Sequence, residues 1–272
     1  MTPYDVANSA ILITGPARSG TTIMGRVIHS MTEVEYAFEP TFLALLAPRL
    51  TDARVRSAYE SWLFQNVLLD SLAGRSINAN CHDESAFVKA KGSIEMAKRL
   101  ASSWTSEELI PLAEGKRVAY KLPEIARTGL RMLEYYPGMS ILGMVREPAE
   151  VVASLLAKGW FANNAGGYYP LELDEWPSHW DELTRCWYYW CEMTKPLLND
   201  DRVFHVSYER LVKSPRSQVK RIAMALGLHY GPMTLDIVGT IKRQKQGPEP
   251  AIPTEMWSRV AEVKALMHAR LG

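Results

Sequence analysis

The segment Gly15–Thr22, with the sequence GPARSGTT, has the residue types and spacing of a loop that binds a phosphate group. Gly15 and Gly20 permit tight turns and a close approach of the backbone to a ligand. Thr21 stands where loops that bind ATP or GTP carry a lysine, and Arg18 provides a cation inside the loop instead. The segment therefore predicts a phosphate site that is not built for a nucleoside triphosphate.

The residues around this loop predict the strand and the helix that must position it. Residues 10–14 are an apolar run that predicts a buried strand, and residues 21–29 predict a helix with Ile23 and Val27 on one face. The first amides of a helix lack intrahelical partners and its dipole is positive at that end, so the helix favours an anion at the loop. A glycine-rich turn without a ligand is the alternative that the two glycines alone leave open.

Short apolar segments alternate with amphipathic helices along the whole chain. Strands are predicted at residues 10–14, 34–38, 117–121, 139–145 and 203–207. The pattern predicts an α/β fold of three layers, with a central, mostly parallel sheet of about five strands, helices on both faces and helical insertions over the active site. Residues 42–110 form the longest insertion. No repeat or linker divides the chain, so residues 1–272 are predicted to form one domain.

Charged residues occur where predicted strands end. Glu39 follows the second strand, Lys121 ends the third and Arg146 follows the fourth. Ligands of open parallel sheets bind at the carboxyl ends of the strands, so we expect these three side chains to lie near the loop. A solvated surface charge is the alternative for each residue taken alone, and Lys121 has Glu124 as a surface partner nearby in the sequence.

Arg146 and Ser154 form a second candidate phosphate site. The serine stands eight positions after the arginine, on the helix that follows the fourth strand. A guanidinium offers a forked pair of donors and a hydroxyl adds a third, which suits a phosphate group. The alternative is an ion pair between Arg146 and Glu150, with Ser154 as a small packing residue.

The composition excludes several classes of protein. The hydrophobic fraction of 47% and the charged fraction of 22% are typical of a folded globular chain, and a net charge of +1 gives no overall attraction to nucleic acid. The three cysteines lack metal-ligand spacing and indicate a reducing compartment. No signal segment or membrane-spanning run is present, so a cytoplasmic protein without stable membrane insertion is expected.

Taken together, the motifs resemble those of sulfotransferases that use 3′-phosphoadenosine 5′-phosphosulfate (PAPS). Residues 16–22 resemble the 5′-phosphosulfate loop of that family, and residues 145–154 resemble its 3′-phosphate motif with the expected arginine-to-serine spacing. Residues 206–212 resemble a later strand and turn, in which Tyr208 corresponds to a tyrosine near the adenine. The resemblance runs in order from about residue 10 to residue 230.

The resemblance implies a P-loop-like fold and in-line transfer of a sulfuryl group from PAPS to a hydroxyl, or less readily an amine, without a metal. The other product is 3′-phosphoadenosine 5′-phosphate (PAP), and the acceptor is a small molecule, a carbohydrate or a lipid. The residues implied to bind the donor are Arg18, Ser19, Gly20, Thr21, Thr22, Arg146, Ser154 and Tyr208. Arg18 and Lys121 are expected to stabilise charge on the leaving phosphate oxygen.

Glu39 is the predicted general base. The cytosolic branch of the family carries a histidine soon after the strand-three lysine, whereas leucine and proline follow Lys121. Glu39 and Pro40 look like the Glu-Pro element of the bacterial and carbohydrate-type branch, in which the glutamate is proposed as the base. His82 is the second candidate base, and a salt bridge or helix cap is the structural alternative for Glu39.

Other parts of the predicted site have no fixed family counterpart. The candidate acceptor-binding residues are His82, Trp160, Phe161 and Tyr168. The family's Arg-Lys-Gly element has a loose counterpart at residues 242–247, which leaves open whether Lys242, Arg243 or Lys245 contacts the nucleotide. Trp187, Tyr188 and Trp190 lie on a predicted helix and are expected in the core. The acceptor's identity and the oligomeric state, a homodimer included, stay open.

Two other classes of function remain as alternatives. A P-loop kinase that uses ATP and Mg²⁺ requires the loop lysine, which this sequence lacks. A non-catalytic nucleotide-binding protein with the same fold requires no further residue, so the sequence leaves that class open.

Overall fold

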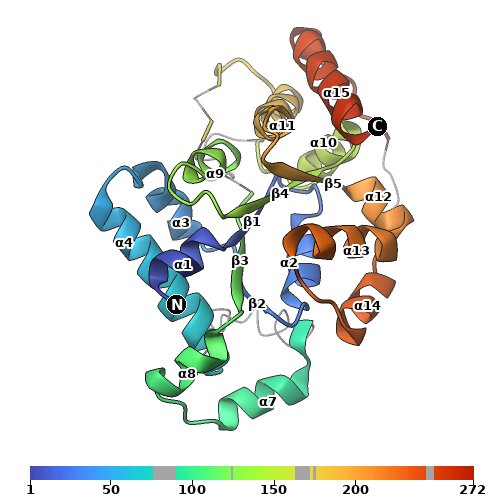
Figure 1. The fold of residues 1–272 in the computed structure, drawn as a ribbon. Helices are drawn as coiled ribbons and strands as arrows, with labels where there is room; N and C mark the ends of the chain where they lie inside the picture. Colours follow the sequence, from blue (N-terminus) through green and yellow to red (C-terminus); the bar gives the residue numbers. More distant parts are fainter. Residues whose placement is uncertain (76–89, 124, 163–171, 174–175, 243–247) are drawn as a thin grey trace.

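A sheet of five parallel strands forms the centre of the computed structural model, which describes residues 1–75, 90–123, 125–162, 172–173, 176–242 and 248–272 (Figure 1). The strands are β1 (Ile11–Thr14), β2 (Val34–Phe38), β3 (Arg117–Lys121), β4 (Ser140–Val145) and β5 (Val203–Ser207). Three predicted strands match in both bounds, and β1 and β4 begin one residue later than predicted. The α/β fold predicted from the sequence is confirmed.

The strand order is β2-β3-β1-β4-β5, so β1 lies in the middle of the sheet. Ile11 pairs with Ala119 of β3 on one side and with Ser140 of β4 on the other. All strands run in the same direction, and their carboxyl ends therefore share one edge. The loop that follows β1 emerges at the centre of that edge, between the ends of β3 and β4.

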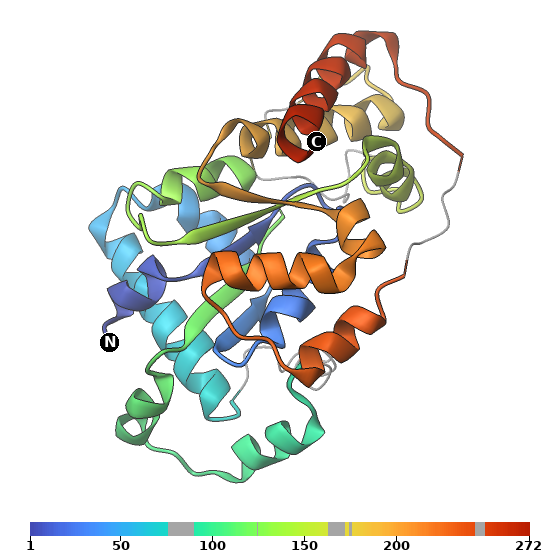
Figure 2. The same cartoon turned by 45° about the vertical axis from the view of Figure 1, so that its right-hand side comes forward.

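Helices cover both faces of the sheet (Figures 1 and 2). One layer consists of α2 (Thr21–His29), α12 (Tyr208–Lys213), α13 (Pro215–Leu226) and α14 (Pro232–Gly239). The opposite layer includes α1 (Pro3–Asn8), α4 (Ala53–Trp62), α9 (Ala126–Met132), α10 (Pro148–Leu156), α11 (Glu182–Asn199) and α15 (Trp257–Leu271). The other described helical elements are α3 (Thr41–Leu46), η1 (Ala47–Arg49), η2 (Leu63–Leu69), α5 (Asp70–Leu72), α7 (Ser93–Ala101), α8 (Ser106–Ala113) and η3 (Thr254–Met256).

The central strand is buried on both faces. Ile11 and Ile13 pack into the core beneath α2, whereas Leu12 packs into the core on the opposite side. A parallel strand covered by two helical layers requires apolar side chains on both faces, which explains the uninterrupted apolar run. Trp187 and Trp190 of α11 are fully buried, as expected from the sequence.

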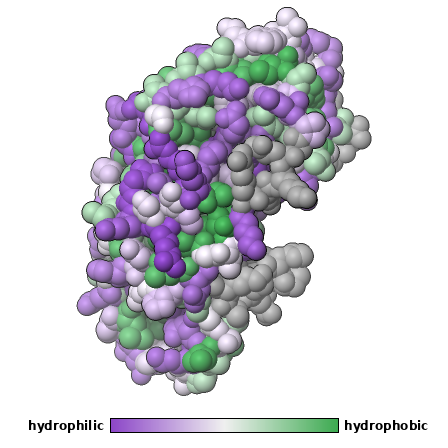
Figure 3. Space-filling model, turned by 90° about the vertical axis from the view of Figure 1, so that its right-hand side faces the viewer, coloured by the Kyte–Doolittle hydropathy of each residue, from purple (hydrophilic) through white to green (hydrophobic). Residues whose placement is uncertain are grey.

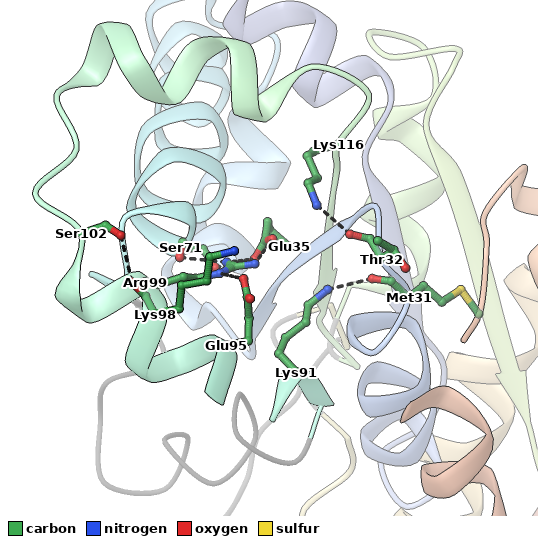
Figure 4. Close-up of polar contacts among 10 residues, drawn as sticks. All are labelled: Met31, Thr32, Glu35, Ser71, Lys91, Glu95, Lys98, Arg99, Ser102 and Lys116. Atoms are coloured by element: carbon green, nitrogen blue, oxygen red, sulfur yellow. Dashed lines mark hydrogen bonds and ion pairs between the residues drawn. The ribbon is translucent and has the colours of Figure 1, made fainter. Parts of the chain in front are cut away.

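A buried ion pair fixes α7 to β2 (Figure 4). The Nη1 and Nη2 atoms of Arg99 donate to the carboxylate of Glu35 at 2.9 and 3.0 Å, and the Ser71 hydroxyl donates to it at 2.6 Å. Burial opposes ionisation of Glu35, but the charges of Lys91 and Arg99 outweigh this effect and lower its pKa to about 2. The fully buried carboxylate is therefore matched by a guanidinium.

Hydrophilic residues predominate on the face of the molecule that Figure 3 presents, with smaller apolar areas between them. This surface agrees with the charged fraction of 22% in the sequence. Among the described helices, none is long and apolar enough to cross a membrane.

Helix α2 packs so closely on β2 that Gly25 has no room for a side chain. A Cβ atom there would lie 2.2 Å from the hydroxyl oxygen of Tyr36. We expect Gly25→Ala to lower the free energy of unfolding by about 1–3 kcal/mol, as overpacking a core does, in chemical denaturation. Part of that loss should return in the double variant Gly25→Ala/Tyr36→Phe, which lacks the nearest clashing atom.

Gly239→Ala is the matched control, because a Cβ added at the end of α14 meets no described atom within 4 Å apart from its chain neighbours and the backbone of its own helix. This variant should leave the free energy of unfolding unchanged or raise it by up to about 1 kcal/mol. An equal loss in both single variants would contradict the packing argument.

Candidate active site

The loop between β1 and α2 forms the first part of the site. Ser19 closes it, because its amide and hydroxyl both donate to the carbonyl of Pro16, at 3.1 and 2.5 Å. Gly20 caps α2 with a φ of 96°, a left-handed conformation that favours glycine. A Cβ at Gly20 would lie 2.5 Å from Cδ2 of Tyr208, so the tyrosine ring packs directly against the loop backbone.

Strained backbone occurs at two of the predicted site residues. Arg18, with a φ of 71°, and Glu39, with a φ of 41°, are the non-glycine residues of the described chain that have positive φ. Such conformations cost on the order of 1–3 kcal/mol each and concentrate at functional sites. Both strained residues follow strand ends at the same edge of the sheet, Arg18 after β1 and Glu39 after β2, with β3 between these two strands.

The two candidate phosphate motifs meet through Arg18. Its Nε atom donates to Oγ of Ser154 at 2.9 Å, and its guanidinium carbon lies 5.9 Å from the ring centroid of Trp160. Arg146 donates from Nη1 to the carbonyl oxygen of Arg18 at 2.8 Å. One hydrogen-bonded network therefore joins residues that lie 128 and 136 positions apart in the chain.

The guanidinium of Arg146 is buried and fixed on several sides. Its Nε and Nη2 atoms donate to Oε2 of Glu150 at 3.0 and 2.7 Å, and its Cζ lies 4.5 Å from the ring centroid of Tyr208. The pairing with Glu150, which the sequence offered as an alternative, is therefore present. It coexists with the contact to the loop, because different nitrogens of Arg146 make the two contacts.

A pocket of about 300 Å³ lies beside this arginine. It is lined by Glu150, Tyr208, Glu209, Val212 and Lys213. Glu209 is held in place because it accepts hydrogen bonds from the amide of Glu147 at 2.8 Å and from the hydroxyl of Ser207 at 3.0 Å. The volume is at the lower end of the range for pockets that bind small molecules.

Lys121 is the most deeply buried of the predicted site cations that the structure describes, with only 2% of its surface exposed. Its Nζ donates to Oγ1 of Thr22 at 3.0 Å, pairs with Oε1 of Glu39 and lies 4.3 Å from the ring centroid of Phe38. The burial excludes a solvated surface position for Lys121. The ammonium instead joins the helix after β1, the end of β2 and the end of β3.

Tyr189 holds the loop from the opposite helical layer. Its hydroxyl oxygen accepts a hydrogen bond from the amide of Ala17 at 2.7 Å, and its ring centroid lies 5.3 Å from that of Phe161. The sequence predicts only a core position for this part of α11, because the pairing spans 172 positions and has no local signal. Tyr189 is therefore a site residue that sequence reasoning missed.

The remaining predicted site residues have no hydrogen bond to the loop among the described contacts, or they lie outside the described residues. Phe161 is 1% exposed and packs against Trp176 and Tyr189, so its ring is a core element and offers no surface to an acceptor. Lys242 is exposed. Several residues named from the sequence lie outside the described residues: His82, Glu124, Tyr168, Arg243 and Lys245.

Comparisons with known proteins agree on one family. The model of the sulfotransferase family matches residues 10–232. The sulfotransferase domain of the olefin synthase from Synechococcus PCC 7002 is 18% identical, covers 95% of this chain and 94% of its own, and has a TM-score of 0.50. The sulfotransferase domain from the curacin biosynthetic pathway is 14% identical, with coverages of 93% and 96% and a TM-score of 0.51. No curated protein matches the chain.

We expect Tyr189→Phe to loosen the loop without unfolding the protein. Losing one buried hydrogen bond costs about 1 kcal/mol or slightly more, so hydrogen exchange at the Ala17 amide should become about tenfold faster. Tyr59→Phe is the matched control, since it removes a buried hydroxyl bonded at 2.8 Å to Tyr120 in the core. If both variants accelerate exchange at Ala17 equally, Tyr189 has no specific role at the loop.

Proposed function

Because this chain belongs to the sulfotransferase family, we propose that its sulfuryl donor is PAPS and that its acceptor is a hydroxyl group of a small molecule, a carbohydrate or a lipid. The observation that carries the proposal is the contact between the two candidate phosphate motifs. Arg18 of the loop bonds to Ser154, and Arg146 bonds to the carbonyl of Arg18. A donor with phosphate groups at both ends of its ribose suits two adjoining cationic sites.

Each part of the donor has a candidate partner in this proposal. The 5′-phosphosulfate takes the loop, where Arg18 and the first amides of α2 favour an anion. The 3′-phosphate takes Arg146 and Ser154, and the adenine takes the pocket beside Tyr208. The absence of the loop lysine supports this donor over ATP, because PAPS has no β- and γ-phosphates to bind.

The proposed reaction breaks the bond between sulfur and the bridging oxygen of the donor. That bond is replaced by one from sulfur to the acceptor oxygen, and the electron pair of the broken bond stays on the phosphate of PAP. Arg18 and Lys121 stabilise the charge that develops on this oxygen, as preorganised donors do in other transfer reactions. The acceptor hydroxyl loses its proton to Glu39.

The surroundings of Glu39 support its role as the base. About a third of its side chain is exposed (36%), so an acceptor can reach the carboxylate from solvent. Its ion pair with Lys121 ties the base to the cation assigned to the leaving group. Trp160, next to Arg18, offers an aromatic face beside the phosphate loop for an organic acceptor.

We expect PAP to bind at least tenfold more tightly than ATP with Mg²⁺ in isothermal titration calorimetry. Arg146→Ala should weaken PAP binding by about 10- to 100-fold, as the loss of charged hydrogen bonds does. The same variant should abolish the preference for PAP over adenosine 5′-phosphate, which lacks the 3′-phosphate. A preference for ATP with metal would overturn the donor assignment.

The control for Arg146→Ala is Arg202→Ala, which removes a surface arginine that pairs with Asp200. Nucleotide affinities should stay within about twofold in this variant, because exposed ion pairs contribute little. A PAP preference that survives in Arg146→Ala would remove Arg146 from the 3′-phosphate site.

For the base, we expect Glu39→Gln to keep PAP affinity within about twofold and to lower turnover by about 10²- to 10⁴-fold. The amide oxygen of glutamine can still accept a hydrogen bond from Lys121, so the loop geometry is retained. Transfer from labelled PAPS to a panel of hydroxyl and amine acceptors provides the assay. Near-normal turnover would exclude Glu39 as the base, whereas a parallel loss of PAP affinity would indicate a structural role.

A further inference from the structure

A second cluster of cations lies at the opposite edge of the sheet from the phosphate loop. A pocket of about 240 Å³ is located where the chain leaves α2 and where β2 and β3 begin. Lys91, Arg99 and Lys116 line it together with Thr32 and Glu95 (Figure 4). These side chains come from three separate stretches of the sequence and converge on one space.

Two of the cations donate hydrogen bonds to backbone carbonyl oxygens of the described residues. Lys91 donates from Nζ to the carbonyl oxygen of Met31 at 2.7 Å, and Lys116 donates to the carbonyl oxygen of Thr32 at 2.7 Å. Within the described chain, neither ammonium pairs with a carboxylate. An ammonium group has three N–H donors, so each lysine keeps donors for a further ligand.

The nearby carboxylates are already engaged with Arg99. Its two terminal nitrogens bind Glu35, and its Nε binds Glu95 at 2.8 Å. Three cations (Lys91, Arg99 and Lys116) therefore face two carboxylates (Glu35 and Glu95), which leaves one net positive charge in the cluster. Burial lowers the pKa of Lys91 to about 8; the charge of Glu35 opposes this effect, the charges of Lys116 and Arg99 add to it, and Glu95 again opposes it.

We propose that this pocket binds a tetrahedral oxyanion between Lys91 and Lys116, either as a free sulfate or phosphate ion or as the phosphate group of a small metabolite. An anion there makes direct ion pairs with two ammonium groups that have none among the described residues, and it offsets the net positive charge of the cluster. Such an ion has roughly the volume of two or three waters, about 60–90 Å³, and fits in the pocket. The hydroxyl of Thr32 is available at the pocket wall as an uncharged donor.

The reactivity of Lys91 tests this proposal. At pH 8 an amine-reactive acetylating reagent modifies neutral amines, and peptide mass spectrometry follows the rate at each lysine. With sulfate at ten times its dissociation constant, the rate at Lys91 should fall about tenfold relative to chloride at matched ionic strength. Lys98, an exposed lysine of the neighbouring helix α7, should react at the same rate in both salts.

Two variants separate this site from the donor loop. In Arg18→Ala, which weakens the loop for anions, sulfate should still protect Lys91 about tenfold. In Lys116→Gln, sulfate should no longer protect Lys91, so its acetylation rates in sulfate and in chloride should agree within about twofold. Equal rates in the two salts for the wild-type protein, or undiminished protection in Lys116→Gln, would overturn the proposal. Neither result depends on the identity of the sulfuryl donor.

The same measurement identifies the form in which the anion arrives. If glycerol phosphate protects Lys91 from acetylation at a lower concentration than inorganic phosphate does, the ligand is the phosphate group of a metabolite. Inorganic sulfate or phosphate that protects more effectively supports a free ion. Protection by none of the three would exclude an oxyanion site.

Discussion

The buried ammonium of Lys121 is the constraint on which the site geometry depends. A charge taken out of water needs partners supplied by the protein, because an unpaired buried charge is strongly destabilising. Thr22, Glu39 and the ring of Phe38 supply those partners here. They come from the helix after β1 and from the end of β2, whereas Lys121 itself ends β3. The need of this one ammonium group for protein partners therefore fixes the ends of β1, β2 and β3 relative to one another.

The sequence predicts the strands and the loop well because their signals are local. Apolar runs mark the five strands to within one residue, and the glycines and the threonines define the start of α2. The strand order is not predictable in this way, because pairing joins residues far apart, such as Ile11 with Ala119 and with Ser140. The site shares this limit, since the sequence brings Arg18 and Arg146 to one edge but contains no sign of their direct contact.

Aromatic residues show where sequence reasoning fails and why. Phe161 follows Trp160 in a stretch with glycines and asparagines nearby, a composition typical of an exposed loop. Its ring nevertheless fills a space between Trp176 and Tyr189, which only the tertiary fold creates. Tyr189 shows the opposite case. It lies on a helix whose neighbouring aromatic residues are predicted to be in the core, yet its hydroxyl oxygen accepts a hydrogen bond from the amide of Ala17 in the loop.

The hydrogen bonds between the two phosphate motifs make them energetically interdependent. Arg18 contributes its side chain to Ser154 and its carbonyl to Arg146, so ordering one guanidinium also restricts the other. Thermodynamic linkage requires the effect to be reciprocal: a ligand group that immobilises one motif lowers the entropic cost of occupying its neighbour by the same free energy. The two ends of a bound nucleotide then act as a cooperative pair, and the affinity of the whole exceeds what its separate fragments indicate.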